Sequence, residues 1–326
     1  MRIKMLAGLF LSVVFVLAFA VSALASPLSH EVQGQVDRLR ELMDETVVES
    51  ISGRTSFNVP QVNIIIPPEG DRDYFLIGVV DEPTPECIEF ILAYTGIPSE
   101  LAYIGKGRGE LEFLITDYVQ EGLPSDDIEE IEPFILPLWL NMGQRIDIVD
   151  GNRRIGLTMG HPINANGISF ATAPHQAGLT NRSVVFAGSN QTIGTVRMSS
   201  FQPNRDVALV DLHNNTFIST NVAGGPISDF RASASTHDSV ISIRGVSGTQ
   251  SSNVFSTSIT ARFPGIPFDF TGRIAIYPNG NSAVGDSGAA LIRRMSPTDR
   301  AVLGTRQGWY TIGNRVVGIY TPVTVY

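Results

Sequence analysis

The sequence predicts an all-β fold for the C-terminal part of the chain, preceded by a small α/β domain. Beyond residue 146, short runs of Val, Ile, Phe and Thr alternate with Gly, Asn, Pro and Ser. They recur at intervals of roughly 8–12 residues, which is typical of sandwiches and barrels. The 326 residues include 31 Gly and 19 Pro, which favours many turns over long helices. The charge is also divided, because the N-terminal part is acidic and the C-terminal part is basic.

Before this fold, residues 1–25 have the features of a signal peptide. Arg2 and Lys4 precede an uncharged apolar run, and Ala23-Leu24-Ala25 is a small-x-small cleavage signal. We therefore expect cleavage before Ser26 and a secreted, extracellular product. An uncleaved membrane anchor is the alternative, since the apolar run approaches the length of a spanning helix. No later segment is predicted to cross a membrane.

Residues 26–140 are expected to be an acidic pro-segment. Its first part has helical periodicity, and Thr84-Pro85-Glu86 is typical of a helix start that Gly96 can end. An acidic stretch from Gly122 to Glu132 should be a solvated linker open to proteases. The expected elements are helices at 31–50 and 84–95 and strands at 62–66, 74–80 and 101–104.

Residues 141–326 form the β-rich domain. This length suits two barrels, at about 146–225 and 236–326, joined by a segment of small residues at 221–235. Residues 27–140 have 23 acidic and 6 basic side chains, whereas residues 141–326 have 9 acidic and 15 basic ones. The two parts should therefore attract each other. The arginines of the basic part are scattered and lack interleaved aromatic residues, so we expect no binding of nucleic acid.

Gly285-Asp286-Ser287-Gly288 is the motif that carries chemistry. A serine hydroxyl is a weak nucleophile unless a base takes its proton and nearby donors stabilise the oxyanion. The glycines allow a sharp turn in which the amides of Gly285 and Ser287 point at one spot. A simple turn between two strands is the alternative reading of this tetrapeptide.

A base and an orienting acid are also present. A strand-like run ends at His175, and Asp206 stands at the head of the run Val207 to Val210. The order His175, Asp206, Ser287 is that of one class of serine hydrolases. Each residue alone has an ordinary structural reading, as a surface histidine or a strand cap. Three such elements in this order, in a β-rich region, favour a catalytic triad.

With these motifs the sequence resembles the chymotrypsin/trypsin-like serine peptidases, closest in pattern to the bacterial streptogrisin and alpha-lytic type. The resemblance covers residues 141–326, and its matching stretches are 154–175, 206–211, 240–260 and 316–323. It implies two six-stranded antiparallel barrels of the trypsin-like fold. The sequence departs from the family pattern in having Pro174, Gln176 and Ala289, and its single cysteine, Cys87, permits no internal disulfide.

The resemblance implies a role for each motif residue. His175 would be the general base and acid, Asp206 the carboxylate that orients it, and Ser287 the acylated nucleophile. The amides of Gly285 and Ser287 would form the oxyanion hole. In the streptogrisin type an arginine of the second barrel pairs with the buried acid of the serine motif. This implies an ion pair between Arg244 and Asp286, with an exposed strand arginine as the alternative.

The specificity pocket is expected to include Ser282 and Arg306, near positions that contact an acidic side chain in glutamate-specific relatives. Residues 141–326 contain no Glu, whereas the pro-segment contains 15. An enzyme that cuts after Glu would spare itself and destroy its pro-segment. Alternatively, Arg306 points outward and the composition reflects lineage, since Lys is also missing from this domain.

The sequence thus predicts a secreted serine endopeptidase that acts on polypeptides through an acyl-enzyme, with a preference for acidic residues as one option. The pro-segment would be an intramolecular inhibitor and folding aid, released by cleavage between about Gly122 and Arg145. A catalytically inactive homologue that acts as an extracellular binding protein is the alternative. We expect a monomer without cofactor or metal, since no ligand-spaced cluster or phosphate loop is present.

Overall fold

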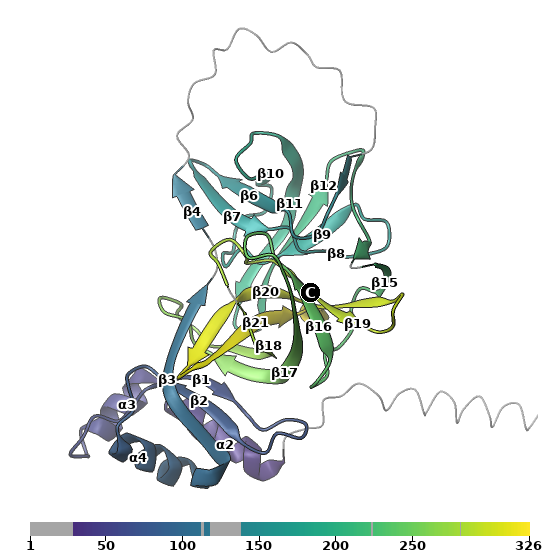
Figure 1. Ribbon diagram of the computed structural model, residues 1–326. Coiled ribbons are helices and arrows are strands. Elements are labelled where there is room, and N and C mark those ends of the chain that lie inside the picture. The colour runs from purple at the N-terminus through teal and green to yellow at the C-terminus, as the bar shows by residue number, and fades with distance from the viewer. Residues whose placement is uncertain (1–28, 112–113, 118–137, 223, 281) are drawn as a thin grey trace, which may run out of the picture.

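The computed structural model describes residues 29–111, 114–117, 138–222, 224–280 and 282–326. The expected signal peptide and the acidic linker at 122–132 lie outside the described residues. The described chain is rich in strands, as predicted, and they form an 11-stranded sheet, an 8-stranded sheet and a two-stranded ribbon. Figure 1 shows the 8-stranded sheet at one end, the N-terminal helices at the other, and the larger sheet between them. In the parts that the structure describes, no helix is long and apolar enough to span a membrane.

The N-terminal domain places helices on one face of three strands. Side chains of Ser29, Asp44 and Thr84 cap the three helices, each accepting a backbone N–H of the first turn. The single helix that we expected at 31–50 is therefore two, because Asp44 starts a second one. The elements are α2 (His30–Glu41), α3 (Glu45–Ser52), α4 (Pro85–Thr95), the short η1 (Ser99–Leu101), β1 (Val62–Ile66), β2 (Phe75–Val79) and β3 (Ala102–Leu111).

The C-terminal part of the larger sheet closes on itself. Its six strands pair antiparallel in the order β16-β17-β18-β21-β20-β19 and back to β16. This ring is a six-stranded barrel. The strands are β16 (Ser239–Ile243), β17 (Thr249–Ala261), β18 (Phe270–Tyr277), β19 (Ala290–Arg294), β20 (Arg300–Ile312) and β21 (Arg315–Pro322).

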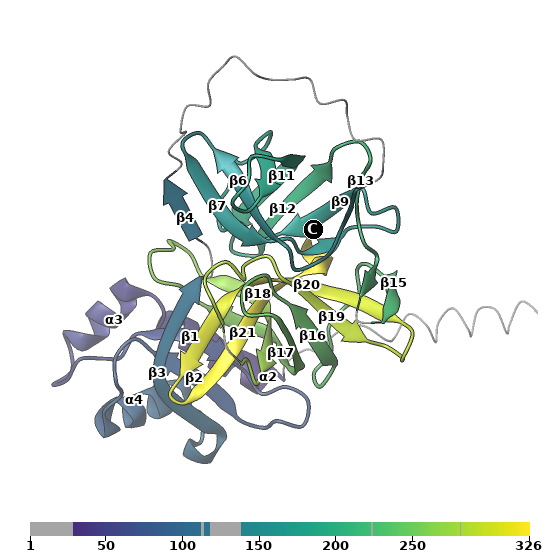
Figure 2. The same cartoon turned by 45° about the horizontal axis from the view of Figure 1, so that its top comes forward.

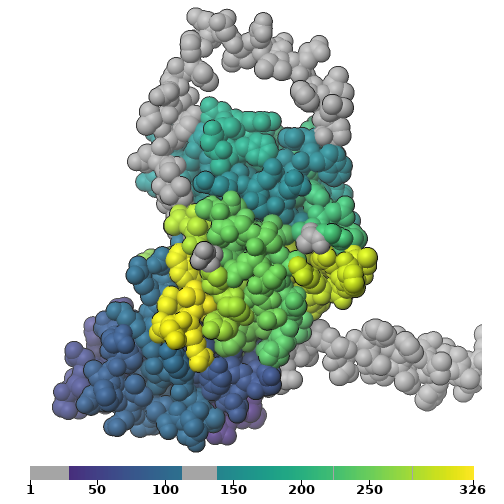
Figure 3. Space-filling view, in the orientation of Figure 1, coloured from purple at the N-terminus to yellow at the C-terminus, as the bar shows by residue number. Residues whose placement is uncertain are grey.

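The N-terminal strands join this barrel. β1 pairs with β17 and β3 pairs with β20, so a second ring runs β1-β2-β3-β20-β21-β18-β17. Ile64, Ile66 and Leu76 are fully buried there against barrel side chains such as Phe263 and Tyr310. Each such side chain contributes about 1.5–3 kcal/mol when it leaves water. The N-terminal domain thus shares a hydrophobic core with the six-stranded barrel, and Figure 3 shows the two packed together.

Charge contributes less to this interface than the net charges suggested. Among the described residues, the ion pair that crosses it joins Asp71 and His237 at 2.6 Å, and both side chains are more than half exposed. Exposed pairs of this kind contribute at most about 1 kcal/mol. Direct contact is made by apolar packing, by strand pairing and by hydrogen bonds of charged side chains to uncharged groups, such as those that Glu69 accepts from Ser256 and Thr257.

The 8-stranded sheet has six main strands and two edge strands, in the order β4-β7-β6-β10-β11-β12-β9-β8 (Figure 2). We expected six strands here. β4, which comes from the expected pro-segment, lies at one edge of the sheet, and the two-residue strand β8 lies at the other. The strands are β4 (Leu114–Asp117), β6 (Arg145–Asp150), β7 (Arg153–Thr158), β8 (His161–Pro162), β9 (Ser169–Thr172), β10 (Ser183–Phe186), β11 (Thr192–Gln202) and β12 (Arg205–Leu212).

The remaining elements lie around the junction of the two large sheets. A core cluster there includes Phe170 from one sheet and Ile292 and Val302 from the other. The chain ends between the sheets, where Tyr326 stacks on His161 (Figures 1 and 2). The remaining elements are β5 (Leu138–Leu140), which pairs in parallel with β13 (Thr216–Ile218), and β14 (Asn221–Val222), β15 (Gly225–Asp229) and η2 (Val323–Val325).

Candidate active site

Three elements bring His175, Asp206 and Ser287 together between the two sheets. β9 and β12 are paired neighbours, so the turn after β9 and the start of β12 place His175 beside Asp206. Ser287 comes from the other sheet, in the turn that leads into β19. Its carbonyl accepts the backbone N–H of Thr158, at the end of β7, which joins the two sheets at this point.

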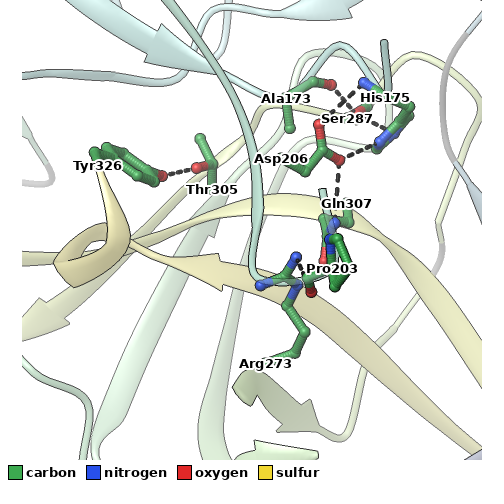
Figure 4. Close-up of polar contacts among 9 residues, drawn as sticks. All are labelled: Ala173, His175, Pro203, Asp206, Arg273, Ser287, Thr305, Gln307 and Tyr326. Atoms are coloured by element: carbon green, nitrogen blue, oxygen red, sulfur yellow. Dashed lines mark hydrogen bonds and ion pairs between the residues drawn. The ribbon is translucent and has the colours of Figure 1, made fainter. Parts of the chain in front are cut away.

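The three side chains form a continuous hydrogen-bonded row (Figure 4). Ser287 Oγ lies 2.6 Å from His175 Nε2, and His175 Nδ1 lies 2.5 Å from Asp206 Oδ2. The backbone N–H of His175 also donates to Asp206 Oδ1 at 3.1 Å. The histidine backbone has φ 53°, a region that few non-glycine residues adopt. Both carboxylate oxygens therefore hold one histidine in a fixed orientation.

The Asp206 carboxyl is fully buried yet favours its charged form. Burial alone would raise its pKa, but the charge and hydrogen bond of His175, the Gln307 amide and the charge of Arg273 together lower the pKa below its usual value. Gln307 Nε2 donates to Oδ2 at 3.1 Å. Arg273 is also fully buried and donates to the Pro203 carbonyl (Figure 4). An ionised Asp206 suits a group that must stabilise an imidazolium.

The turn around Ser287 depends on two glycines with positive φ. Gly285 has φ 98° and Gly288 has φ 89°. A Cβ at Gly288 would stand 1.9 Å from Thr172 Oγ1, so this position requires glycine. Thr158 Oγ1 donates to the Gly285 carbonyl at 2.7 Å. Among the described residues, the amides of Gly285 and Ser287 donate to no acceptor.

Ser287 and His175 are covered in this structure. Ser287 is 0% exposed and His175 is 6% exposed. Ser287 Oγ also lies 2.6 Å from the carbonyl oxygen of Ala173. The single hydroxyl proton can go to this carbonyl or to the imidazole, but not to both at once.

The expected ion pair between Arg244 and Asp286 is not formed. The Asp286 carboxylate accepts the amides of Val246, Ser247 and Ala283 at 2.9–3.1 Å, and the Ser247 hydroxyl as well. A carboxylate with three amide donors is satisfied without a cation in contact. Among the described residues, Arg244 reaches Asp286 only through Ser247, whose Oγ lies 3.5 Å from Nη1.

Ser282 and Arg306 contact each other beneath the Ser287 turn. Arg306 is fully buried, which excludes the outward-pointing alternative. Its Nη2 donates to Ser282 Oγ at 2.7 Å, and its Nη1 donates to Asn279 Oδ1 and to the Tyr320 hydroxyl at 3.1 and 2.8 Å. Its backbone is tied to the nucleophile turn, because its carbonyl accepts the N–H of Gly288. A positive charge therefore lies on the strand beside Ser287.

The edge of β20 beyond Arg306 is occupied by β3. The antiparallel register pairs Gly308 with Leu111, Trp309 with Glu110 and Tyr310 with Gly109. A Cβ on Gly308 would lie 2.1 Å from the Glu110 carbonyl oxygen, so the glycine is needed for this close approach. An extended segment of the N-terminal domain thus lies along β20, the strand whose Arg306 carbonyl accepts the N–H of Gly288 beside Ser287.

Sequence reasoning missed several residues of the site. Gln307, Arg273 and Thr158 each contact or influence the site, yet none was singled out, although Thr158 lies in the stretch 154–175 that resembles the family. Asn279 and Tyr320 were also missed, although Tyr320 stands in the stretch that resembles the closing strand of the family. Away from the row, the hydroxyls of Tyr326 and Thr305 meet (Figure 4), and burial raises the pKa of the Tyr326 phenol.

Among the residues that the structure describes, no group of three or more His, Cys, Asp or Glu side chains is placed to hold a metal ion.

No protein-family model and no curated protein matches the sequence. The solved structures to which the chain is similar include three proteases.

A Nocardiopsis protease is 18% identical with a TM-score of 0.44, over 57% of this chain and 94% of its own. The chymotrypsin of Cellulomonas bogoriensis is 20% identical with a TM-score of 0.44, over 58% and 93%. A serine protease described as glutamic acid specific is 19% identical with a TM-score of 0.45, over 57% and 95%.

Proposed function

We propose that this chain is a secreted serine endopeptidase that hydrolyses peptide bonds through an acyl-enzyme. The observation that carries the proposal is the unbroken row from Ser287 Oγ through the His175 imidazole to the buried Asp206 carboxylate. A serine hydroxyl so placed, next to amides that donate to no described residue, has both the base and the oxyanion donors that acyl transfer needs.

The reaction follows from this arrangement. As Ser287 Oγ attacks the substrate carbonyl carbon, its proton passes to His175 Nε2, and the amides of Gly285 and Ser287 stabilise the oxyanion. Asp206 stabilises the imidazolium. His175 then protonates the leaving amine, and the carbon–nitrogen bond breaks to leave an acyl-enzyme. Water attacks this ester with His175 again as the base, which releases the acid and restores the serine.

The proposed substrates carry an acidic side chain on the acyl side of the scissile bond. Ser282 Oγ accepts hydrogen bonds from Arg306 Nη2 and from Asn279 Nδ2, at 2.7 and 2.9 Å. With both lone pairs used, the hydroxyl proton can be donated to a substrate atom. A substrate carboxylate can accept a hydrogen bond from this hydroxyl and is attracted by the Arg306 guanidinium, whereas a neutral amide gains less from the positive charge.

The N-terminal domain is proposed to be the inhibitor and folding aid of the catalytic part. β3 already occupies the edge of β20 on which an extended substrate would lie. We propose that a cut between residues 122 and 145 begins maturation and that the mature monomer acts extracellularly on polypeptides. Because β3 and β4 pair with catalytic strands, release also requires these pairings to open.

The pro-segment itself suggests a test substrate. β3 pairs with β20 up to Leu111, and the next residue of the sequence is Glu112. A synthetic peptide that copies residues 108–116, with Glu110 replaced by Gln so that a single Glu remains, should therefore be cleaved after Glu112. Matched peptides with Gln or Lys at this position should be cleaved at least tenfold more slowly.

Ser287→Ala is the matched control for this assay, since it removes only the nucleophilic oxygen. Hydrolysis of the Glu peptide that persists in this variant would contradict the assigned nucleophile. Equal rates for the Glu, Gln and Lys peptides in the wild-type enzyme would leave the peptidase intact but would contradict the acidic preference.

A further inference from the structure

The Arg306 guanidinium is part of a closed ring of five hydrogen-bonded, buried polar side chains. Arg306 and Arg244 both donate to Asn279 Oδ1, at 3.1 and 2.7 Å. Arg244 Nε donates to Ser242 Oγ at 3.0 Å, and the Tyr320 hydroxyl donates to the same Oγ at 2.7 Å. Tyr320 in turn accepts from Arg306, which closes the ring. All five side chains are at least nine-tenths buried.

The shared acceptor keeps two positive charges close together under the pocket. Two guanidinium groups on one amide oxygen repel each other, and this repulsion is felt strongly where water is excluded. A carboxylate at Ser282 would be attracted by both charges and would offset their repulsion. A neutral amide of the same shape would gain far less. Arg244 therefore adds to the electrostatics at Ser282, whose hydrogen bonds with described side chains are those to Arg306 and Asn279.

Arg244 also fixes the geometry of the groups that do contact the pocket. By holding Asn279 Oδ1 it turns Asn279 Nδ2 toward Ser282 Oγ, and this leaves the serine proton as the donor to a ligand. Its contact with Ser247 reaches the loop that binds the Asp286 carboxylate. Removing the Arg244 guanidinium would leave Arg306 Nη1 as the remaining described donor to Asn279 Oδ1, so Asn279, and with it the Ser282 hydroxyl, would be held less firmly.

We propose that Arg244 is a positioning residue of an acid-binding specificity pocket, acting on Arg306 and Ser282 through Asn279 and adding a second positive charge. This inference rests on the proposed peptidase activity. It concerns only which side chain the pocket selects, and not the rate at which a neutral substrate reacts.

The test compares kcat/KM of the mature enzyme for the Glu and Gln peptides of residues 108–116. Arg244→Gln should lower the Glu-to-Gln ratio of kcat/KM roughly tenfold, because the Glu peptide loses the attraction of the second positive charge and the Gln peptide does not. Arg244→Lys, which keeps the charge, should retain most of the ratio. Arg293→Gln is the matched control, because Arg293 lies on the neighbouring strand β19 and pairs with Asp238. It should leave the ratio unchanged.

Each contrary result has a separate meaning. An unchanged ratio in Arg244→Gln, or an equal loss on both peptides, would overturn the role of Arg244 alone. A wild-type enzyme that does not distinguish the peptides would overturn the acidic pocket, and one that cleaves neither would overturn the peptidase itself. Should Arg244→Gln fail to fold, Asn279→Ala must lower the ratio in the same way, or the inference fails.

Discussion

Docking of β3 on β20 depends on a close fit that a single methyl group should disturb. Gly109 faces Tyr310, and a Cβ added there would stand 2.3 Å from the Tyr310 ring. Ordinary carbon contacts are about 3.5–4.0 Å, so one of the two strands must shift by about 1 Å. Tyr310 cannot turn away, because it is fully buried and its hydroxyl lies within hydrogen-bond distance of the carbonyls of Asn63 and Arg262, either of which can accept its proton.

Overpacking of this kind costs about 1–3 kcal/mol, which corresponds to a roughly 5–150-fold larger open fraction. Gly109→Ala in the full-length Ser287→Ala chain, which cannot process itself, should therefore speed amide hydrogen exchange in β3 by this factor. Gly34→Ala is the matched control, since a Cβ there meets nothing within 4 Å. Unchanged exchange in Gly109→Ala would refute the reasoning that this fit holds β3 in place.

Three further predictions concern the site and its surroundings. Gln307→Ala removes a donor to Asp206, so the pKa of that carboxyl should rise, kcat/KM should fall roughly tenfold, and the pH–rate profile should lose activity at a higher pH on its acid side. Burial lowers the pKa of His161 to about 4, whereas in the unfolded chain the imidazole binds its proton below about pH 6.5. The free energy of unfolding should therefore fall by about 3 kcal/mol between pH 7 and pH 4. Denaturant unfolding of His161→Phe should not show this loss. Gly288→Ala forces a Cβ against Thr172 at positive φ and should lower the free energy of unfolding by about 3 kcal/mol or more, and a variant as stable as wild type would contradict the crowding described here.

The sequence allowed the β-rich class to be predicted because strand periodicity and turn residues are local signals. It also singled out His175, Asp206 and Ser287, which stand in short motifs with a recognisable order. The structure places their side chains in one hydrogen-bonded row. The start of α4 was predicted from its capping residue Thr84. The cap at Asp44 was missed, so one helix was expected where the structure has two.

Features set by distant parts of the chain could not be predicted. Most partners of Asp286 are backbone amides of two loops, and a backbone donor cannot be recognised from the type of residue that carries it. Gln307 meets Asp206 across 101 residues of sequence. The pairing of β1 with β17 and of β3 with β20 of the six-stranded barrel is likewise non-local, and neither strand carries a local sequence signal for it.

The central claim is that Ser287 is a nucleophile activated by His175. Its most direct test is reaction of the mature protein with a serine-directed fluorophosphonate, followed by mass-spectrometric location of the adduct. One adduct on Ser287 is predicted, and His175→Ala should react at least a thousandfold more slowly, because the residues of such a unit fail together. An adduct on another residue, or equally fast labelling of His175→Ala, would contradict the claim.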